Sequence, residues 1–179
     1  MNLYLRLLVV LVKALFAPRR GALEPARLRL RVWPHDCDAN LHLNNGRYLA
    51  FMDLGRLYLL GQAGVLGLLV RRHWAPVLSG VEVSFIRPIA PLARVAIETR
   101  LLSWDEKYFY VTQRFECRGR LCAVATVKGL FVSRGARIAS RDVIAALGIE
   151  IEAPPLPEHV QRWNALLDAK KNAMQGTAA

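Results

Sequence analysis

Hydrophobic and polar residues alternate strictly along residues 26–33, ARLRLRVW. One side of this segment is apolar and the other is basic: Leu28, Leu30 and Val32 against Arg27, Arg29 and Arg31. A period of two is typical of a strand that buries one face. We therefore expect a strand with an arginine-lined outer face, which ends at Pro34.

The segment 46–60, GRYLAFMDLGRLYLL, is apolar on almost every side. Three charged side chains interrupt it: Arg47, Asp53 and Arg56. A helix with so little polar surface has to be buried. Asn44 or Asn45 can cap its start, because an asparagine side-chain oxygen accepts a hydrogen bond from a free backbone amide.

Four further strand-like runs follow this helix, separated by turn-forming residues: 77–87, 94–103, 107–117 and 120–133. The last run is apolar at both odd and even positions, which indicates a strand covered on both faces. One segregated helix with a series of consecutive antiparallel strands is typical of the α+β class. Because the helix has no polar side to expose, we expect the sheet to wrap around it.

The end of the chain adds two expected helices, a short one over 141–148 and a C-terminal one over about 158–171, with a Pro-rich spacer between them. We expect three parts in the chain. These are an N-terminal arm over 1–20, a domain over 26–150, and the spacer with the C-terminal helix over 151–179.

The N-terminal arm, MNLYLRLLVVLVKALFAPRR, carries charges inside its apolar stretch. The uninterrupted run from Leu7 to Val12 lies between Arg6 and Lys13 and is much shorter than the roughly 20 residues that span a bilayer. These charges, and Leu15 where a cleavage site needs a small residue, argue against a cleaved signal peptide.

As a helix, this arm is amphipathic. Arg6 and Lys13 are two helical turns apart and share one side. The apolar side consists of Leu3, Leu7, Val10, Leu11 and Ala14. Such a helix could lie on an anionic bilayer surface, or it could pack on its own domain or on a neighbouring subunit. The sequence leaves these alternatives open.

Composition and charge narrow the functional classes. Hydrophobic residues make up 54% of the 179 residues, which indicates a large oligomer interface, an apolar ligand site or membrane contact. The net charge of +11 favours phosphate-bearing partners. No nucleic-acid partner is expected, because the sequence contains neither a reading helix nor a basic and aromatic platform.

The three cysteines are sparse and scattered, which fits a reducing compartment and argues against a disulfide framework or a zinc site. They are Cys37, Cys117 and Cys122. We expect a cytoplasmic protein, with peripheral contact of residues 1–20 with the inner membrane surface as one of the alternatives left open above.

The stretch HDCDANLHLNNGRYL, residues 35–49, crowds small polar groups directly before the buried helix. It begins like a calcium loop, but Leu41 and Arg47 stand where such a loop needs glycine and glutamate. No metal is therefore expected. Asp and Asn side chains also form turns and cap helices, yet one cap needs one oxygen, and this explanation leaves Asp36 and Asp38 without a purpose.

A catalytic interpretation accounts for both features. The first amides of a buried helix have no acceptor within the helix, and they stabilise an oxyanion that develops on a nearby carbonyl. A carboxylate in the preceding loop can attack that carbonyl or activate a water. These parts suffice for hydrolysis of an activated acyl group such as a thioester.

The motif D-C-D-A-N-L-H-L-N-N-G-R-Y-L-x-x-M-D-L-G-R resembles the N-terminal motif of the hotdog-fold thioesterases of the 4-hydroxybenzoyl-CoA type. It is most similar to the branch of thioesterase-superfamily-member-6-like proteins, and F-I-R-P at residues 85–88 also fits the family. The resemblance covers about residues 26–135. It implies a five-stranded antiparallel sheet wrapped around the long helix, a homodimer or homotetramer, and no cofactor.

The resemblance also implies site residues. Asp38 matches the catalytic aspartate, the polarising amide belongs at or near Asn45, and Asp36 is either structural or orients the catalytic group. His42 and Asn44 are expected to line the entrance or to hold the loop.

An acyl-CoA or acyl-carrier substrate would need further contacts. Its acyl chain is expected between the helix and the sheet, beside Tyr48, Met52 and Phe85. Arginines at the mouth would hold the phosphates. The candidates are Arg87, Arg118, Arg120 and Arg134.

Two other functions remain open on the same fold. A non-catalytic, membrane-associated protein that binds acyl chains or lipids would not need Asp38. A dehydratase or hydratase would need a histidine and carboxylate pair, for which His42 is the only plausible histidine, and the H-F-P-G type of motif is absent.

Overall fold

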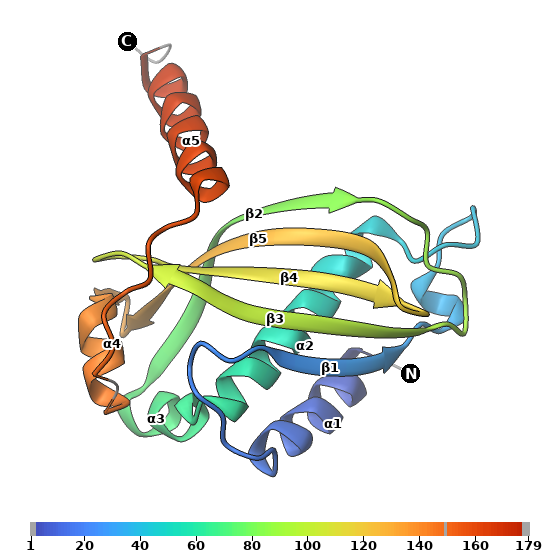
Figure 1. The fold of residues 1–179 in the computed structure, drawn as a ribbon, viewed down its shortest axis with the longest axis horizontal. Helices are drawn as coiled ribbons and strands as arrows, with labels where there is room; N and C mark the ends of the chain where they lie inside the picture. The colour runs from blue at the N-terminus through green and yellow to red at the C-terminus, as the bar shows by residue number, and fades with distance from the viewer. Residues whose placement is uncertain (1–2, 149, 177–179) are drawn as a thin grey trace.

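The computed structural model describes residues 3–148 and 150–176, and its largest element is a curled antiparallel sheet. Five strands form it in this order: β1 (Ala26–Arg31), β3 (Arg94–Trp104), β4 (Phe109–Cys117), β5 (Arg120–Ser133) and β2 (Trp74–Phe85). A short additional strand, β6 (Ala136–Ile138), pairs with β5. The long helix α2 (Asn45–Gln62) runs along one face of this sheet (Figure 1). The predicted α+β arrangement, a five-stranded sheet around a long helix, is confirmed.

Side chains of α2 form the main core with the sheet. Tyr48, Phe51 and Met52 are each at most 2% exposed and belong to one cluster with Ile97 of β3 and Phe115 of β4. The sheet is thus held on α2 mainly by the burial of large apolar side chains, the dominant favourable term in folding.

The helix α2 approaches the sheet closely at Gly55, where polar side chains of the sheet lie against the helix backbone. A Cβ added there would lie 2.8 Å from Gln113 Nε2 and 2.8 Å from Thr99 Oγ1, so no side chain fits. The Gln113 amide donates to the Met52 carbonyl at 2.9 Å and to Thr99 Oγ1 at 2.9 Å. These buried polar groups are tolerated because they bond one another.

The N-terminal helix α1 (Leu3–Leu15) packs on α2 and β1. Val10 lies in a cluster with Leu28 of β1 and Leu54 of α2. Near the other end, a Cβ added to Gly61 would lie 2.5 Å from the Cβ of Ala14, so the two helices approach closely there. Packing of the arm on its own domain, one of the predicted alternatives, is therefore what the structure shows.

One part of the amphipathic prediction is wrong. Arg6 was expected to share a polar outer side with Lys13, but its side chain is 2% exposed and turns toward the domain. The reason is a buried carboxylate, Asp36, which lies thirty residues further along the chain and pairs with the guanidinium.

The helix α3 (Val65–Arg72) was not predicted from the sequence. It follows Gly64, whose φ of 82° lies in the left-handed region that favours glycine, and it is bent 94° from α2. Val65 holds it in place, packed with Phe131 and Val143. The eight residues are too short to form a stable helix alone, so these tertiary contacts decide their structure.

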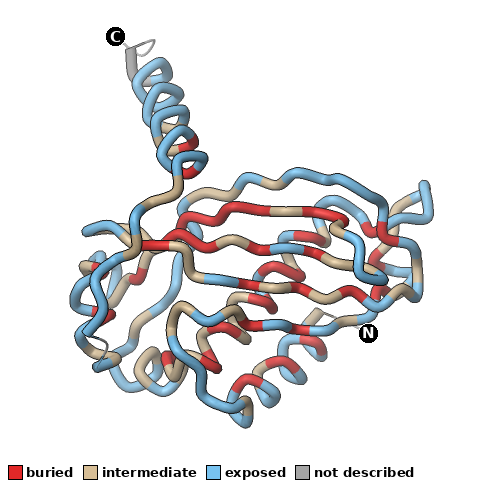
Figure 2. Tube along the Cα trace, in the orientation of Figure 1, coloured by how far each residue is buried: buried red, intermediate tan, exposed pale blue. Residues whose placement is uncertain are grey.

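Two helices follow the sheet, α4 (Ser140–Ala146) and α5 (Glu158–Gly176). The first turns of α5 contact the sheet on the side away from α2, and the rest of the helix projects from the body (Figures 1 and 2). Trp163 is buried at this contact and lies against Gly80 of β2. Together with α2, this contact covers β5 on both faces, as predicted, since four consecutive residues from Ala125 to Lys128 are buried.

A chain of hydrogen bonds ties α5 to the sheet. Lys128 Nζ donates to Asn164 Oδ1 at 2.8 Å, and Asn164 Nδ2 donates to the Tyr110 hydroxyl at 2.9 Å. The Tyr110 hydroxyl donates in turn to Asp105 Oδ2 at 2.6 Å. The ionised form of Asp105 therefore contributes to the attachment of α5.

We expect Asp105→Asn to lower the melting temperature at neutral pH and to have less effect as the pH falls. Burial alone raises the pKa of this carboxyl, but hydrogen bonds from the Tyr110 hydroxyl and from the amides of Tyr108 and Lys107 outweigh it and hold the pKa below its ordinary value of 3.8. A lowered folded-state pKa stabilises the fold above the ordinary pKa, and this stabilisation disappears as the pH falls through the folded-state value.

Thermal unfolding of parent and variant across this acidic range measures the effect. A difference in melting temperature that stays constant from neutral to acidic pH would contradict the role given to Asp105.

Candidate active site

The segment between β1 and α2 carries the candidate acids, and backbone hydrogen bonds fold it into a tight loop. Cys37 and Leu43 form an isolated antiparallel bridge. Inside it, the Asp38 amide donates to the His42 carbonyl at 2.9 Å, and the Leu41 amide donates to the Asp38 carbonyl at 3.0 Å. Leu41 has a φ of 57°, unfavourable for a side chain of its size, so this tip is held by the surrounding bonds.

The same loop is attached to the start of α2. The Asn44 amide donates to the Asp36 carbonyl at 2.9 Å, and Asn44 Oδ1 accepts from the Gly46 amide at 2.9 Å. Asn44 is therefore the N-cap, one of the two residues predicted for that position. Asn45 is the first helical residue, and helix geometry leaves its amide without an acceptor inside the helix.

Asp36 is fully occupied by structural contacts. Its carboxylate is 1% exposed and accepts from Arg6 at 3.1 Å and 2.5 Å, and from the Trp33 amide at 2.8 Å. Arg47 Nε lies 3.6 Å away. Asp36 therefore joins α1 to the loop, as the structural role expected for it requires.

Asp38 is more exposed than Asp36, and its carboxylate accepts fewer hydrogen bonds. Its side chain is half-buried, and within the described residues its carboxylate accepts one hydrogen bond, from the Asn40 amide at 2.9 Å. The neighbouring Cys37 is a poor nucleophile, because burial first, and then the carboxylates of Asp36 and Asp38, raise the pKa of its thiol. Of the two aspartates in the loop, Asp38 is therefore the one whose carboxylate remains available.

The other predicted site residues fall into two groups. His42, Asn44 and Asn45 are exposed around the loop and the helix start. The other four lie further along the chain. Tyr48 and Met52 are buried in α2, Phe85 ends β2, and Arg87 follows that strand. The rings of Tyr48 and Phe85 are 4.9 Å apart, and Arg87 donates to the Leu121 carbonyl at 2.7 Å.

Tyr48 and Met52 are packed too tightly to line a cavity in one protomer, with exposed fractions of 2% and 0%. Burial raises the pKa of Tyr48 to about 12, so its hydroxyl stays protonated at neutral pH. A substrate contact at these two residues stays a prediction that needs them to move.

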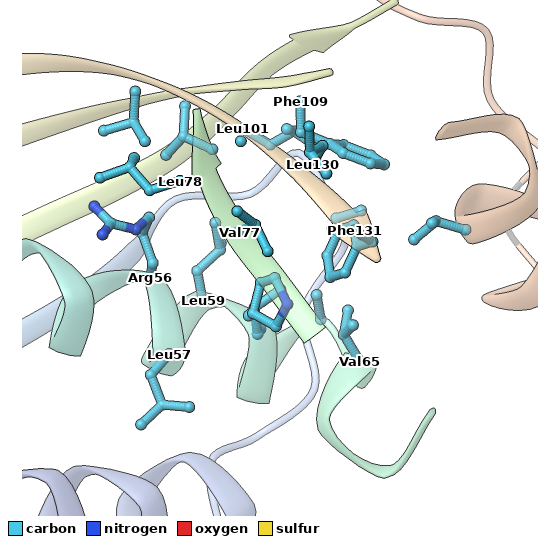
Figure 3. Close-up of a pocket in the computed structure, with 18 of the residues that line it drawn as sticks. Arg56, Leu57, Leu59, Val65, Val77, Leu78, Leu101, Phe109, Leu130 and Phe131 are labelled. Atoms are coloured by element: carbon cyan, nitrogen blue, oxygen red, sulfur yellow. The ribbon is translucent and has the colours of Figure 1, made fainter. Parts of the chain in front are cut away.

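A large apolar cavity lies elsewhere, between the second half of α2, the sheet and α4. Its volume is about 300 Å³. Its wall includes Leu57, Leu101 and Phe131, which Figure 3 labels. Leu60, Val111 and Val143 also line it. It begins at Asp53, eight residues after Asn45, or about 12 Å along the helix axis at about 1.5 Å per residue. None of the predicted site residues lines it.

Two charged residues, Asp53 and Arg56, also line this cavity. Arg56 donates to Gln113 Oε1 at 2.9 Å and pairs with Asp53. Burial lowers the pKa of the Arg56 guanidinium, and the adjacent Asp53 opposes that shift. Sequence reasoning missed this cavity, because periodicity shows which side chains face inward and carries no information on whether they leave a void between them.

The predicted arginine-lined face of β1 borders a second hollow, about 560 Å³ in volume, on the sheet surface. Five arginines line it: Arg27, Arg29, Arg31, Arg94 and Arg118. Glu116 also lines it and pairs with Arg27 at 2.7 Å. Arg118 is among the arginines predicted to hold phosphates, while Arg87 lies outside this hollow.

A family model matches most of this chain, and a known protein is similar to nearly all of it. Residues 32–164 match the thioesterase-like superfamily. Protein THEM6 of Xenopus laevis is 28% identical over 206 residues, covering 98% of this chain and 94% of that protein.

Solved structures show the same fold at low identity. The probable thioesterase YbaW of Escherichia coli is 18% identical with a TM-score of 0.63, covering 68% of this chain and 95% of that one. SAV2348 of Staphylococcus aureus, solved in complex with CoA, is 12% identical with a TM-score of 0.62, covering 76% and 92%.

Proposed function

Because this chain belongs to the thioesterase-like superfamily, we propose that it hydrolyses an acyl thioester at the loop between β1 and α2. The observation that carries the proposal is that the two aspartates of this loop have different environments. Asp36 is buried in an ion pair, while Asp38, two residues later, keeps an available carboxylate in a loop bonded to the helix start.

In the proposed reaction, the thioester carbonyl oxygen lies at the start of α2, with the Asn45 amide as its donor. The Asp38 carboxylate either attacks the carbonyl carbon or takes a proton from the water that attacks it. The amide stabilises the resulting oxyanion. Collapse of this intermediate breaks the carbon–sulfur bond and releases the thiolate, which is then protonated. On the nucleophilic route, water hydrolyses the acyl-Asp38 anhydride afterwards.

We propose CoA or an acyl-carrier group as the thiol part of the substrate. The binding of CoA by a protein of the same fold supports this choice. The arginine-lined hollow offers this chain's own support, because arginine binds phosphate oxygens with paired hydrogen bonds.

A homodimer or homotetramer is part of the proposal. β2 is an edge strand of twelve residues, and Val77, Leu78 and Phe85 on it are between 42% and 49% exposed. A long apolar edge of this kind pairs readily with another strand. Sedimentation velocity of the full chain measures the assembly state.

Binding of an acyl chain without catalysis is the second candidate function. It is favoured by the apolar cavity, whose walls do not include Asp38 or Asn45. A single alkyl chain of a lipid would fit such a volume and avoid water there.

A hydrolysis screen separates the two candidates. Acyl-CoA substrates of graded chain length are incubated with the full chain, and released thiol is measured with a thiol-detecting dye. Turnover on at least one chain length is expected. No turnover on any of them, together with saturable binding of a fluorescent fatty acid, would replace the hydrolase proposal with the binding one.

A further inference from the structure

The outer side of α1 is apolar. The six most exposed large apolar side chains of the helix and its end lie on it: Tyr4, Leu5, Leu8, Val12, Leu15 and Phe16. Their exposed fractions run from 46% for Val12 to 85% for Phe16, although apolar side chains of this size are usually buried. They follow one another at spacings of one, three or four residues, so they form a continuous stripe along the helix and its end.

The helix α1 buries a charged side chain and exposes leucines, whereas an ordinary surface helix exposes its charges and buries its leucines. Its inner side carries Arg6, whose charge is balanced by Asp36, together with Val10 and Ala14. Lys13, the remaining charge of the helix, is exposed on the flank of the apolar stripe. A helix that placed its charge inside and its leucines in water would lose the benefit of hydrophobic burial, which indicates that something apolar covers the stripe.

Basic groups surround the stripe at its C-terminal end. Arg19 and Arg20 follow the helix, and Arg19 is held by a hydrogen bond from Nη1 to the Gly61 carbonyl at 2.9 Å. The exposed Arg71 and Arg72 lie at the end of α3, on the same side of the molecule as α1 (Figure 1). An apolar helix face beside several cations is suited to a surface that offers both hydrocarbon and negative charge.

We propose that the outer side of α1 docks on the surface of an anionic lipid bilayer. The helix would lie flat, with the stripe inserted at the boundary of the headgroups and acyl chains and the arginines at the phosphates. A second copy of the chain is a poorer occupant of this face, because the same face of another copy would bring the same arginines against these.

The dimensions of α1 agree with docking at the surface. Thirteen residues give a length of about 20 Å, shorter than the hydrocarbon core of a bilayer. Across residues 3–148 and 150–176, no single helix has the length and apolarity needed to cross a membrane, and only the bent pair of α2 and α3 meets both criteria together.

Vesicle sedimentation tests the proposal on the full chain. We expect the protein to sediment with vesicles of equimolar phosphatidylcholine and phosphatidylglycerol, less with phosphatidylcholine alone, and less again at high salt. The double variant Leu8→Glu and Leu15→Glu should lower partitioning by at least about tenfold, because it places two charges in the inserted stripe. Circular dichroism and the melting temperature should stay near those of the parent, since both side chains are more than half exposed.

The matched control places the same charges on α5, where Leu166 and Met174 are 51% and 79% exposed. Leu166→Glu with Met174→Glu should partition like the parent. Equal loss in both double variants, or parent binding that ignores phosphatidylglycerol, would overturn the proposal. It would also be overturned if the α1 variant only dissociated an oligomer in sedimentation velocity. Because no substrate is used, the outcome is independent of thioester hydrolysis.

Discussion

Replacement of Asp38 by asparagine is expected to lower the rate of thioester hydrolysis at least about a hundredfold, the effect of losing a general base or nucleophile. Asparagine keeps the side-chain oxygen that accepts from the Asn40 amide, so the loop should keep its shape. The measurement is release of thiol from the best acyl-CoA of the screen, parent beside variant.

Controls make this result specific to the site. Asp168→Asn removes an exposed carboxylate on α5 and should leave turnover unchanged. Near-parental turnover of Asp38→Asn would eliminate Asp38 as the catalytic group. In that case the chain could still be a hydrolase with another nucleophile or base, but the two-aspartate arrangement would not explain it.

Removal of the Arg6 guanidinium is expected to have the largest effect on stability. In Arg6→Met, the Asp36 carboxylate, which is 1% exposed in the parent, loses its main partner. Removing one member of a buried ion pair usually costs about 3–5 kcal/mol. The guanidinium also lies 4.9 Å from the centre of the Phe51 ring, so a contact with the core is lost as well. The free energy of unfolding in urea measures this cost.

Arg20→Met is the matched control for that experiment. Arg20 pairs with Glu24 at 3.6 Å, but the two side chains are 49% and 56% exposed, and exposed pairs contribute less than about 1 kcal/mol. Adding Asp36→Asn to Arg6→Met should restore part of the lost stability, because it removes the unpaired charge. If Arg6→Met is no more destabilising than Arg20→Met, the pair does not hold α1 to the loop.

These two experiments probe a physical link between α1 and the proposed catalytic loop. Asp36 accepts from Arg6 through its carboxylate and from the Asn44 amide through its carbonyl. Asp38 lies two residues further on. The inner side of the helix therefore supports the position of the loop, while its outer side is the one proposed to meet the bilayer.

Periodicity was sufficient to predict the long central helix and the main strands. The alternation over 26–33 corresponds to β1 at Ala26–Arg31, and the all-round apolar segment 46–60 corresponds to α2 at Asn45–Gln62. Both signals are local, because a strand or helix repeats along consecutive residues. α3 gave no such signal, since its eight residues depend on distant contacts with Phe131 and Val143.

Some features of the candidate site are likewise local, and others depend on distant contacts. The helix start identifies Asn44 and Asn45 from neighbouring residues, whereas the choice of Asp38 over Asp36 as the catalytic candidate rests on the resemblance to hotdog-fold thioesterases. The partner of Asp36 is not defined in this way. Arg6 lies thirty residues earlier and, from its spacing to Lys13, was expected on an outer polar side.

The sequence by itself determined the α+β fold, the position of the buried helix and the aspartates that precede it, since each follows from the order of adjacent residues. The tertiary structure alone decided which aspartate is neutralised, which side of α1 is left in contact with solvent, and where the apolar cavity lies. These depend on which distant surfaces meet and how completely they fill the space between them, and no short-range pattern encodes that.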